Sequence, residues 1–233
     1  MRKKWLRVMA VIPLLCVVFR VCPALSAQKP LDVYYHVATT EKVIALTFDD
    51  GPHPRYTDEI LGILKKENIR ATFFAIGSNV AAYPDVMRRV MDAGHEIGNH
   101  TYNHPIVHTV TDLQLAEEIE KTDEILRNLG YSGNGLFRPP QGKCSSAMPA
   151  LLERTNKTAI LWNIDTRDWA HRPSEEIVQE IEGSVCGGDI ILFHDYVSGE
   201  STTIPALKKL IPMLKERGYQ FVTVSELLSL KDS

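Results

Sequence analysis

The residues with the clearest capacity for chemistry are two adjacent carboxylates, Asp49 and Asp50, in the segment Thr47-Phe48-Asp49-Asp50-Gly51. The apolar run Val43-Ile44-Ala45-Leu46 before them predicts a buried strand, which Gly51 and Pro52 would end. Adjacent carboxylates in a buried place repel one another unless a cation or a shared proton compensates. The segment therefore predicts a metal site or an acid/base pair, with capping of the next helix by aspartate as the alternative.

A pair of histidines, His100 and His104, follows a later predicted strand. One helical turn would place residues at this spacing on one face, about 5–6 Å apart, which suits two ligands of one cation. Pro105 disfavours a helical His104, so the pair His100 and His104 is favoured over His104 and His108. Two histidines and one aspartate predict a site with open positions for water and substrate. Zinc is the first choice for such a site, where it would polarise a carbonyl and lower the pKa of bound water to about 7.

Further polar residues follow other predicted strands, where functional groups of parallel α/β folds gather. Arg138 is a candidate partner that orients a carboxylate, and Asp168 is a candidate partner that keeps His194 protonated. His194 is then the candidate general acid, and the pocket carboxylate that does not bind metal is the candidate base. Trp169, beside Asp168, is expected to line the site.

Strands and helices alternate along the chain, which predicts an α/β fold with parallel strands. The expected architecture is a single-domain distorted (β/α) barrel of about seven strands, and an open doubly wound sheet is the alternative. Strands are expected over residues 43–48, 71–76, 95–98, 136–137, 159–162, 189–193 and 220–224. Helices are expected over residues 57–67, 84–93, 111–129, 145–154, 173–182, 205–217 and 226–230.

Residues 1–27 are typical of a secretory signal peptide, with a basic start, a 12-residue apolar run from Val8 to Phe19, and small residues at Ala24-Leu25-Ser26-Ala27. An uncleaved membrane anchor over these residues is the alternative. Residues 28–42 are expected to form an exposed lead-in, and residues 43–230 the folded domain. The protein is therefore expected to be secreted or attached to the cell envelope.

The net charge indicates which kinds of partner the protein is expected to bind, and the cysteine content indicates whether a disulfide is possible. Cleavage after residue 27 would remove five basic residues and no acids, and would change the net charge from −3 to −8. An acidic chain without a basic stripe is not expected to bind nucleic acid, and a neutral substrate fits it better than a polyanion. Cys144 and Cys186 remain as a pair that an oxidising compartment would allow to form a disulfide, although their spacing does not decide this.

The motifs together resemble the polysaccharide deacetylases, the NodB-homology enzymes of carbohydrate esterase family 4. The resemblance covers roughly residues 40–228. Five segments carry it in order: Thr47-Phe48-Asp49-Asp50-Gly51, His100-Thr101-Tyr102-Asn103-His104, Arg138-Pro139-Pro140-Gln141-Gly142, Asp165-Thr166-Arg167-Asp168-Trp169 and Leu192-Phe193-His194.

The resemblance implies a distorted (β/α) barrel and a role for each motif. It implies that Asp49 is the general base, paired with Arg138. It implies that His194 is the general acid, tuned by Asp168. The implied metal ligands are Asp50, His100 and His104. Trp169 and Leu192 would line the pocket for the acetyl methyl, and the backbone N–H of Gln141 would bind the oxyanion, although the family usually has Tyr or Gly at that position.

The implied activity is removal of N-acetyl groups from N-acetylglucosamine units of peptidoglycan or a chitin-like glycan by an exported hydrolase. The implied cofactor is Zn²⁺ or another divalent transition metal, and no obligate protein partner is evident. Deacetylation of N-acetylmuramic units or acetylated xylan, or of small cyclic amides, is an alternative. A catalytically silent glycan-binding module is another, although binding alone needs no complete set of acid, base and metal ligands.

Overall fold

The computed structural model describes residues 33–133 and 135–232. The expected signal peptide and the first part of the lead-in, residues 28–32, lie outside these ranges. Among the residues that the structure describes, no helix is both long enough and apolar enough to cross a membrane.

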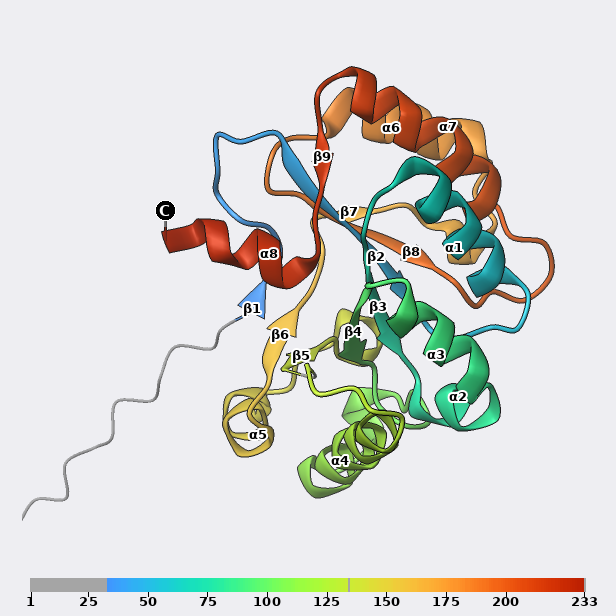
Figure 1. Ribbon diagram of the computed structural model, residues 1–233. Coiled ribbons are helices and arrows are strands. Elements are labelled where there is room, and N and C mark those ends of the chain that lie inside the picture. The colour runs from blue at the N-terminus through green and yellow to red at the C-terminus, as the bar shows by residue number, and fades with distance from the viewer. Residues whose placement is uncertain (1–32, 134, 233) are drawn as a thin grey trace, which may run out of the picture.

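The centre of the fold is one curled sheet whose named strands all pair in parallel (Figure 1). The order across it is β1-β6-β5-β4-β3-β2-β8-β7, and β9 pairs with the first residues of β2. The strands are β1 (Val33–Tyr34), β2 (Val43–Asp49), β3 (Thr72–Ala75), β4 (Glu96–Asn99), β5 (Leu136–Phe137), β6 (Thr158–Ile160), β7 (Ile164–Asp165), β8 (Ile190–His194) and β9 (Gln220–Phe221). The curled, all-parallel sheet confirms the expected distorted barrel.

Most helices pack around the outside of this sheet, whereas α8 (Val224–Ser229) packs on the other face of β2, where Val224 and Leu227 share a core cluster with Val43 and Ala45 (Figure 1). The other helices are α1 (Tyr56–Glu67), α2 (Gly77–Ala82), α3 (Pro84–Asp92), α4 (Asp112–Asn128), α5 (Met148–Thr155), α6 (Ser174–Ser184) and α7 (Thr203–Glu216). The described residues also form four short 3-10 helices: η1 (Val107–Thr109), η2 (Pro140–Gly142), η3 (Asp168–Ala170) and η4 (Leu230–Asp232).

Local sequence explains where individual helices begin and end. The side chain of Thr111 accepts a hydrogen bond from the backbone N–H of Gln114, and the side chain of Gln114 caps Thr111 in return, which forms a capping box at the start of α4. Pro84 occupies the first turn of α3, where a missing N–H costs little. Asn68 ends α1 in a left-handed conformation, which asparagine tolerates better than most residues.

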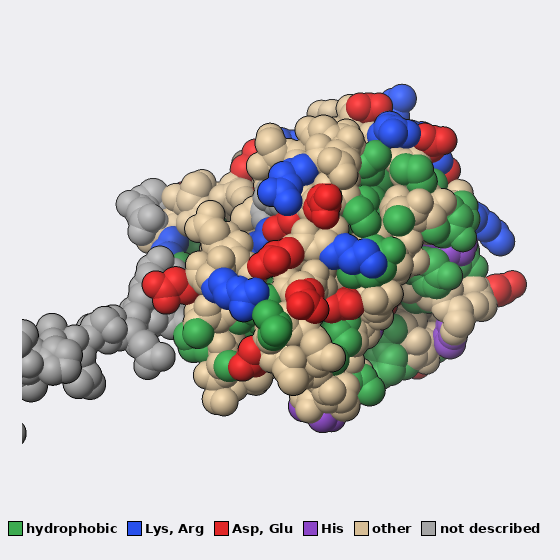
Figure 2. Space-filling model, turned by 90° about the horizontal axis from the view of Figure 1, so that it is seen from below, with side chains coloured by type: hydrophobic (Ala, Val, Ile, Leu, Met, Phe, Trp, Pro, Cys, Tyr) green, Lys and Arg blue, Asp and Glu red, His purple; other side chains and the backbone are tan. Residues whose placement is uncertain are grey.

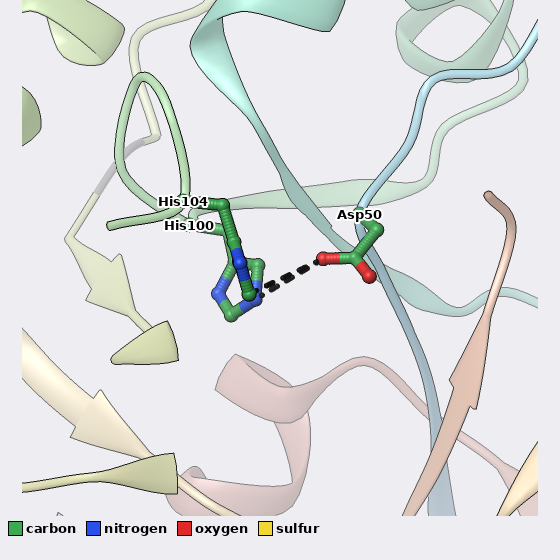
Figure 3. Close-up of side chains that lie close together, drawn as sticks. All are labelled: Asp50, His100 and His104. Carbon is green, nitrogen blue, oxygen red and sulfur yellow. Dashed lines mark ion pairs between the residues drawn. The ribbon is translucent and has the colours of Figure 1, made fainter. Parts of the chain in front are cut away.

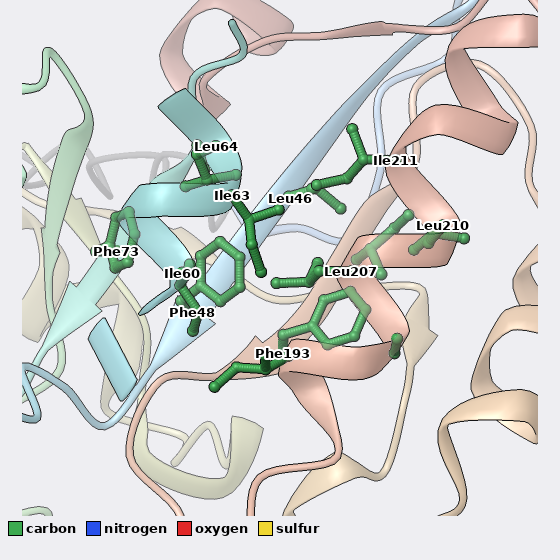
Figure 4. Packing of buried hydrophobic residues seen from close by; sticks show 14 of the residues in the cluster. Leu46, Phe48, Ile60, Ile63, Leu64, Phe73, Phe193, Leu207, Leu210 and Ile211 are labelled. Carbon is green, nitrogen blue, oxygen red and sulfur yellow. The ribbon is translucent and has the colours of Figure 1, made fainter. Parts of the chain in front are cut away.

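The main core lies between the sheet and the pair α1 and α7 (Figure 4). All seven residues of β2 are buried, as expected for a central strand covered on both faces. Phe48 of β2 stacks on Phe73 of β3 and Phe193 of β8, with ring centroids 4.9 and 6.0 Å apart. The core thus fixes β2 against β3 and β8, the strands whose ends carry the chemistry.

Several sequence expectations are corrected. The strand count was short by two, because β1 and β7 have two residues each and show no periodic pattern. The lead-in is not simply exposed, since β1 pairs with β6 and Val37 is buried. The helix α2 was missed because Gly77 suggested a stop. The disulfide, which the sequence left undecided, is absent: Cys144 and Cys186 are free, exposed thiols.

Candidate active site

The end of β2 places Asp49 against a buried arginine. Nη1 of Arg138 donates to Oδ1 of Asp49 at 2.7 Å, and both side chains are almost fully buried. The other guanidinium nitrogens are bound by backbone carbonyls of Ile160 and Leu161, at 3.1 and 3.0 Å. Burial lowers the pKa of Arg138, while the charge of Asp49 and its hydrogen bond oppose that shift. Since each of its three nitrogens donates at least one hydrogen bond, the guanidinium is fixed and holds one carboxylate oxygen in place.

Asp50 faces two imidazoles (Figure 3). Its Oδ1 lies 3.5 Å from Nε2 of His100 and 3.6 Å from Nε2 of His104. This Oδ1 is buried, and the described part of the chain offers it no hydrogen-bond partner. The three residues form a group in which one ligand atom from each lies within 4.8 Å of the others. Asp50, His100 and His104, but not the alternative His108, therefore meet as one candidate cation site.

The imidazole of His100 is prepared for such a role by its second nitrogen. Nδ1 lies 2.7 Å from the carbonyl oxygen of Arg138, which can only accept, so Nδ1 carries the proton and Nε2 has a free lone pair. Burial lowers the pKa of His100 against the raising effect of the Asp49 and Asp50 charges. A neutral ring with its lone pair toward Asp50 is the form that binds a cation.

His100 and His104 are brought together by a different local structure from the one that was expected. They were expected on one face of a helical turn, but residues 100–104 form a loop after β4. Thr101 and His104 have φ values of 68° and 53°, in the left-handed region. The loop is fixed by Oδ1 of Asn99, which accepts from the N–H of Thr101 at 2.8 Å, and by Glu118, which accepts from the N–H of Asn103 at 2.6 Å. Side-chain hydrogen bonds, not helical periodicity, bring the rings together.

His194 and Asp168 form a second polar pair beside β2. The register pairs His194 of β8 with Asp49 of β2. Nδ1 of His194 lies 2.7 Å from Oδ1 of Asp168, whose other oxygen accepts from the N–H of His194 at 2.8 Å and from Thr203 at 2.5 Å. Burial alone would lower the pKa of His194, but the hydrogen bond and charge of Asp168, together with Asp49 and Asp50, raise it to about 9. The ring is therefore protonated at neutral pH.

The three predicted substrate contacts lie on different elements. Leu192 is buried in β8 and is paired with Thr47 in the register. Trp169, in η3, is 56% exposed although Asp168 beside it is fully buried. Gln141 is exposed and has a φ of 58°, so the chain uses at this position a conformation that glycine adopts more readily.

Sequence reasoning assigned no role to several residues that support the site. Asp195 is buried, accepts from Thr57 at 2.6 Å, and packs so closely on Gly51 that a Cβ there would lie 2.1 Å from its carboxylate. Burial raises the pKa of Asp195 to about 7, against the hydrogen bond from Thr57. Thr203 holds Asp168, as described above. The sequence did contain a signal for Asp195, because it directly follows the candidate acid His194. No sequence pattern marks Thr203 or Thr57.

Comparison with known proteins identifies the family of this chain. Residues 36–160 match the family model described as polysaccharide deacetylase. A peptidoglycan-N-acetylglucosamine deacetylase of Bacillus cereus is 40% identical over 85% of this chain and 94% of its own length. The peptidoglycan-N-acetylmuramic acid deacetylase PdaC of Bacillus subtilis is 36% identical over 84% of this chain, which spans 40% of that longer protein. The crystal structure of the Bc1960 peptidoglycan N-acetylglucosamine deacetylase superposes with a TM-score of 0.81 at 34% identity, over 84% of this chain and 92% of that one.

The family model covers more than half of the chain, and the relatives match along most of the described domain, so the resemblance read from the five motifs is confirmed. The chain belongs to the polysaccharide deacetylase family.

Proposed function

We propose that this polysaccharide deacetylase is a metal-dependent hydrolase that removes N-acetyl groups from N-acetylglucosamine units of peptidoglycan or a chitin-like glycan. One observation carries the proposal: the adjacent carboxylates have separate partners. Oδ1 of Asp49 is held by Arg138, whereas Asp50 faces His100 and His104. Asp49 is therefore a candidate base, and the adjacent Asp50 belongs to a candidate metal site.

The residues of the cation site fit a divalent metal such as Zn²⁺. Two imidazole nitrogens and one carboxylate oxygen are a common donor set for zinc, and the buried, unpartnered Oδ1 of Asp50 calls for a positive partner. Asp50, His100 and His104 would hold the ion. When bound there, the ion supplies Lewis-acid polarisation of the scissile carbonyl.

In this proposal, Asp49 takes a proton beside that site. Its Oδ1 is fixed by Arg138, and its Oδ2 lies 3.7 Å from Nε2 of His100, on the side of the cation site. In the proposed reaction, Oδ2 accepts the proton of the water that attacks the amide carbon. Arg138 makes no contact with substrate in this scheme and acts by orienting the base.

In this proposal, His194 donates a proton to the leaving amine. Its ring is held by Asp168 through Nδ1, so Nε2 carries the proton to be donated. Cleavage of the carbon–nitrogen bond then yields acetate and the free amine of the sugar. The backbone N–H of Gln141 would bind the developing oxyanion, and Leu192 and Trp169 would enclose the acetyl methyl.

A weakly charged glycan suits the protein's surface. On the face shown in Figure 2, acidic and basic side chains are interspersed and form no continuous basic stripe. Export to the cell envelope, expected from residues 1–27, would bring the enzyme to such a polymer. N-Acetylmuramic units are the competing substrate, because PdaC, named for that activity, is 36% identical.

The test uses purified peptidoglycan glycan strands and chitooligosaccharides as substrates. We expect acetate release that is lost with a chelator and restored by Zn²⁺, and product masses that place the free amine on glucosamine. Free amines only on muramic units would contradict the assigned sugar. Undiminished acetate release after complete metal removal would contradict the metal dependence.

A further inference from the structure

The junction of β3 and α2, residues 76–79, lies between the two loops that carry the candidate metal ligands. In the sheet order β4-β3-β2, β3 is the middle strand. Asp50 follows β2, whereas His100 and His104 follow β4. These three strands are parallel, so their C-terminal ends lie at one edge of the sheet, with the β3–α2 junction in the middle. None of its residues belongs to the five motifs.

The β3–α2 junction is bound through its backbone to the histidine loop, residues 100–104. The N–H of Gly77 donates to the carbonyl oxygen of Thr101 at 2.9 Å, and the N–H of Ser78 donates to that of Tyr102 at 2.9 Å. Both acceptors lie between the two histidine ligands. The first N–H groups of a helix have no partner within it, so α2 binds this loop without losing a hydrogen bond of its own.

The β3–α2 junction also binds the turn that carries Asp50. The N–H of Ile76 donates to the carbonyl oxygen of Gly51 at 3.0 Å. Nδ2 of Asn79 donates to the carbonyl oxygen of Asp50 itself at 2.7 Å. The side chain of Asn79 therefore connects α2 directly to the backbone of a candidate metal ligand.

The backbone of Asp50 depends on such support. Its φ is 74°, in the left-handed region, which costs any residue other than glycine and persists only where surrounding contacts favour it. This conformation sets the direction in which the side chain leaves the turn. Oδ1 of Asp50 thereby lies 3.5 Å from Nε2 of His100 and 3.6 Å from Nε2 of His104. A change in φ would move this oxygen away from the two imidazoles.

We propose that Asn79 is a positioning residue of the metal site. Its hydrogen bond holds Asp50 in the left-handed conformation, while the N–H groups of Gly77 and Ser78 hold the histidine loop against the same turn of α2. The β3–α2 junction thus fixes the spacing of the three ligands before an ion binds, which lowers the cost of rearrangement on binding. The inference rests on the metal dependence in the proposed function and assigns a task to a residue outside the five motifs.

Asn79→Leu tests the inference, because it keeps a side chain of similar size and removes the donor. The Kd for Zn²⁺ is measured on the metal-free protein by competition with a chromophoric chelator, which needs no turnover. We expect this Kd to rise about tenfold, at the lower end of the loss that follows removal of a hydrogen bond behind a metal ligand. Asn79→Ala removes the same donor without adding an apolar side chain and should give the same result. An unchanged Kd in both variants would overturn the positioning role.

Val80→Ala is the matched control from the same helix. Val80 is fully buried in the main core, so its truncation should lower the free energy of unfolding in urea and leave the Kd for Zn²⁺ unchanged. If Asn79 served only the stability of α2, zinc affinity would instead fall with folding stability in Val80→Ala and Asn79→Ala alike. That pattern would contradict the proposal.

Crystal structures of the metal-free unmodified protein and of metal-free Asn79→Leu separate failure of this inference from failure of the proposed function. We expect Asp50 to leave the left-handed region in the variant, and its Oδ1 to move away from His100. An unchanged φ at Asp50 would overturn the positioning role even in a zinc-dependent enzyme. If the unmodified protein bound no zinc and released no acetate, the proposed function would fail, and the two structures would still decide whether Asn79 holds Asp50.

Discussion

Replacing Asp168 with Asn removes the charge that keeps the proton on His194. The exchange preserves the size of the side chain and an oxygen that can accept hydrogen bonds. Asp168 is fully buried and contacts His194 through both of its oxygens, at 2.7 and 2.8 Å. Asp168→Asn therefore tests the proposed acid with little change in packing.

The magnitude follows from the pKa of His194. It is raised from 6.5 to about 9; burial opposes this shift, and Asp168 is the largest raising influence. Without that charge we expect a pKa near or below 6.5, a fall of about two units or more, worth about 3 kcal/mol. A bound divalent ion would offset the contributions of Asp49 and Asp50 in both proteins alike, so the difference between them persists.

The assay is the pH dependence of kcat for acetate release. A general acid works when protonated, so activity falls as the pH rises through its pKa. The unmodified enzyme should stay active up to a pH near 9, whereas Asp168→Asn should lose activity from a pH near 6.5, about 30-fold at pH 8. Asp165→Asn is the matched control, since Asp165 belongs to the same motif but accepts from the N–H of Arg167. Superimposable pH profiles for Asp168→Asn and the unmodified enzyme would refute the proposed acid.

The same pair makes stability depend on pH. Because the folded pKa of His194 lies above the unfolded value, the pair contributes its full stability below pH 6.5 and loses it as the pH rises through about 9. The difference in free energy of unfolding between the unmodified protein and Asp168→Asn should therefore shrink between pH 6 and pH 9.5 in urea titrations. A difference that grew with pH would contradict the sign of the shift.

Three further substitutions test the supporting contacts. Gly51→Ala would place a Cβ 2.1 Å from Asp195 and should cost about 1–3 kcal/mol in urea unfolding; unchanged stability would show that the turn has room. Thr203→Val removes the 2.5 Å hydrogen bond to Asp168 and should shift the basic limb of the pH–rate profile downward, whereas an unshifted limb would make Thr203 merely structural. Gln141→Gly keeps the backbone N–H and suits a φ of 58°, so kcat should stay within about twofold; a tenfold loss would assign the side chain a direct role.

The sequence was sufficient to predict the elements with a strong local signal. The strand β2 begins with the apolar run Val43-Ile44-Ala45-Leu46 and ends at Asp49, and α4 shows helical periodicity between a capping threonine and Gly130. These signals arise within single segments, so they could be read without tertiary contacts. Because strands and helices alternate, the strands were expected to be parallel. Their C-terminal ends then lie at one edge of the sheet, so the motifs at those ends were expected to lie close together.

Features that depend on tertiary contacts were not predictable in the same way. Gly77 marks the end of a strand, as predicted, but the helix α2 that begins there was missed. Its packing on α4, where a Cβ at Gly77 would lie 2.4 Å from the hydroxyl of Thr122, is a tertiary contact. The meeting of His100 and His104 was predicted, but for the wrong reason, since the loop depends on Glu118 in α4. The support of Asp168 by Thr203 joins residues 35 positions apart, and no local pattern marks it.

The central claim is that two adjacent aspartates have different tasks, and metal content measured beside acetate release tests it most directly. Asp49→Asn should retain stoichiometric metal by elemental analysis but release almost no acetate, because the ligand cluster is intact and the base is lost. Asp50→Asn should lose most of its metal. Metal loss in Asp49→Asn with full retention in Asp50→Asn would contradict the account and exchange the two roles.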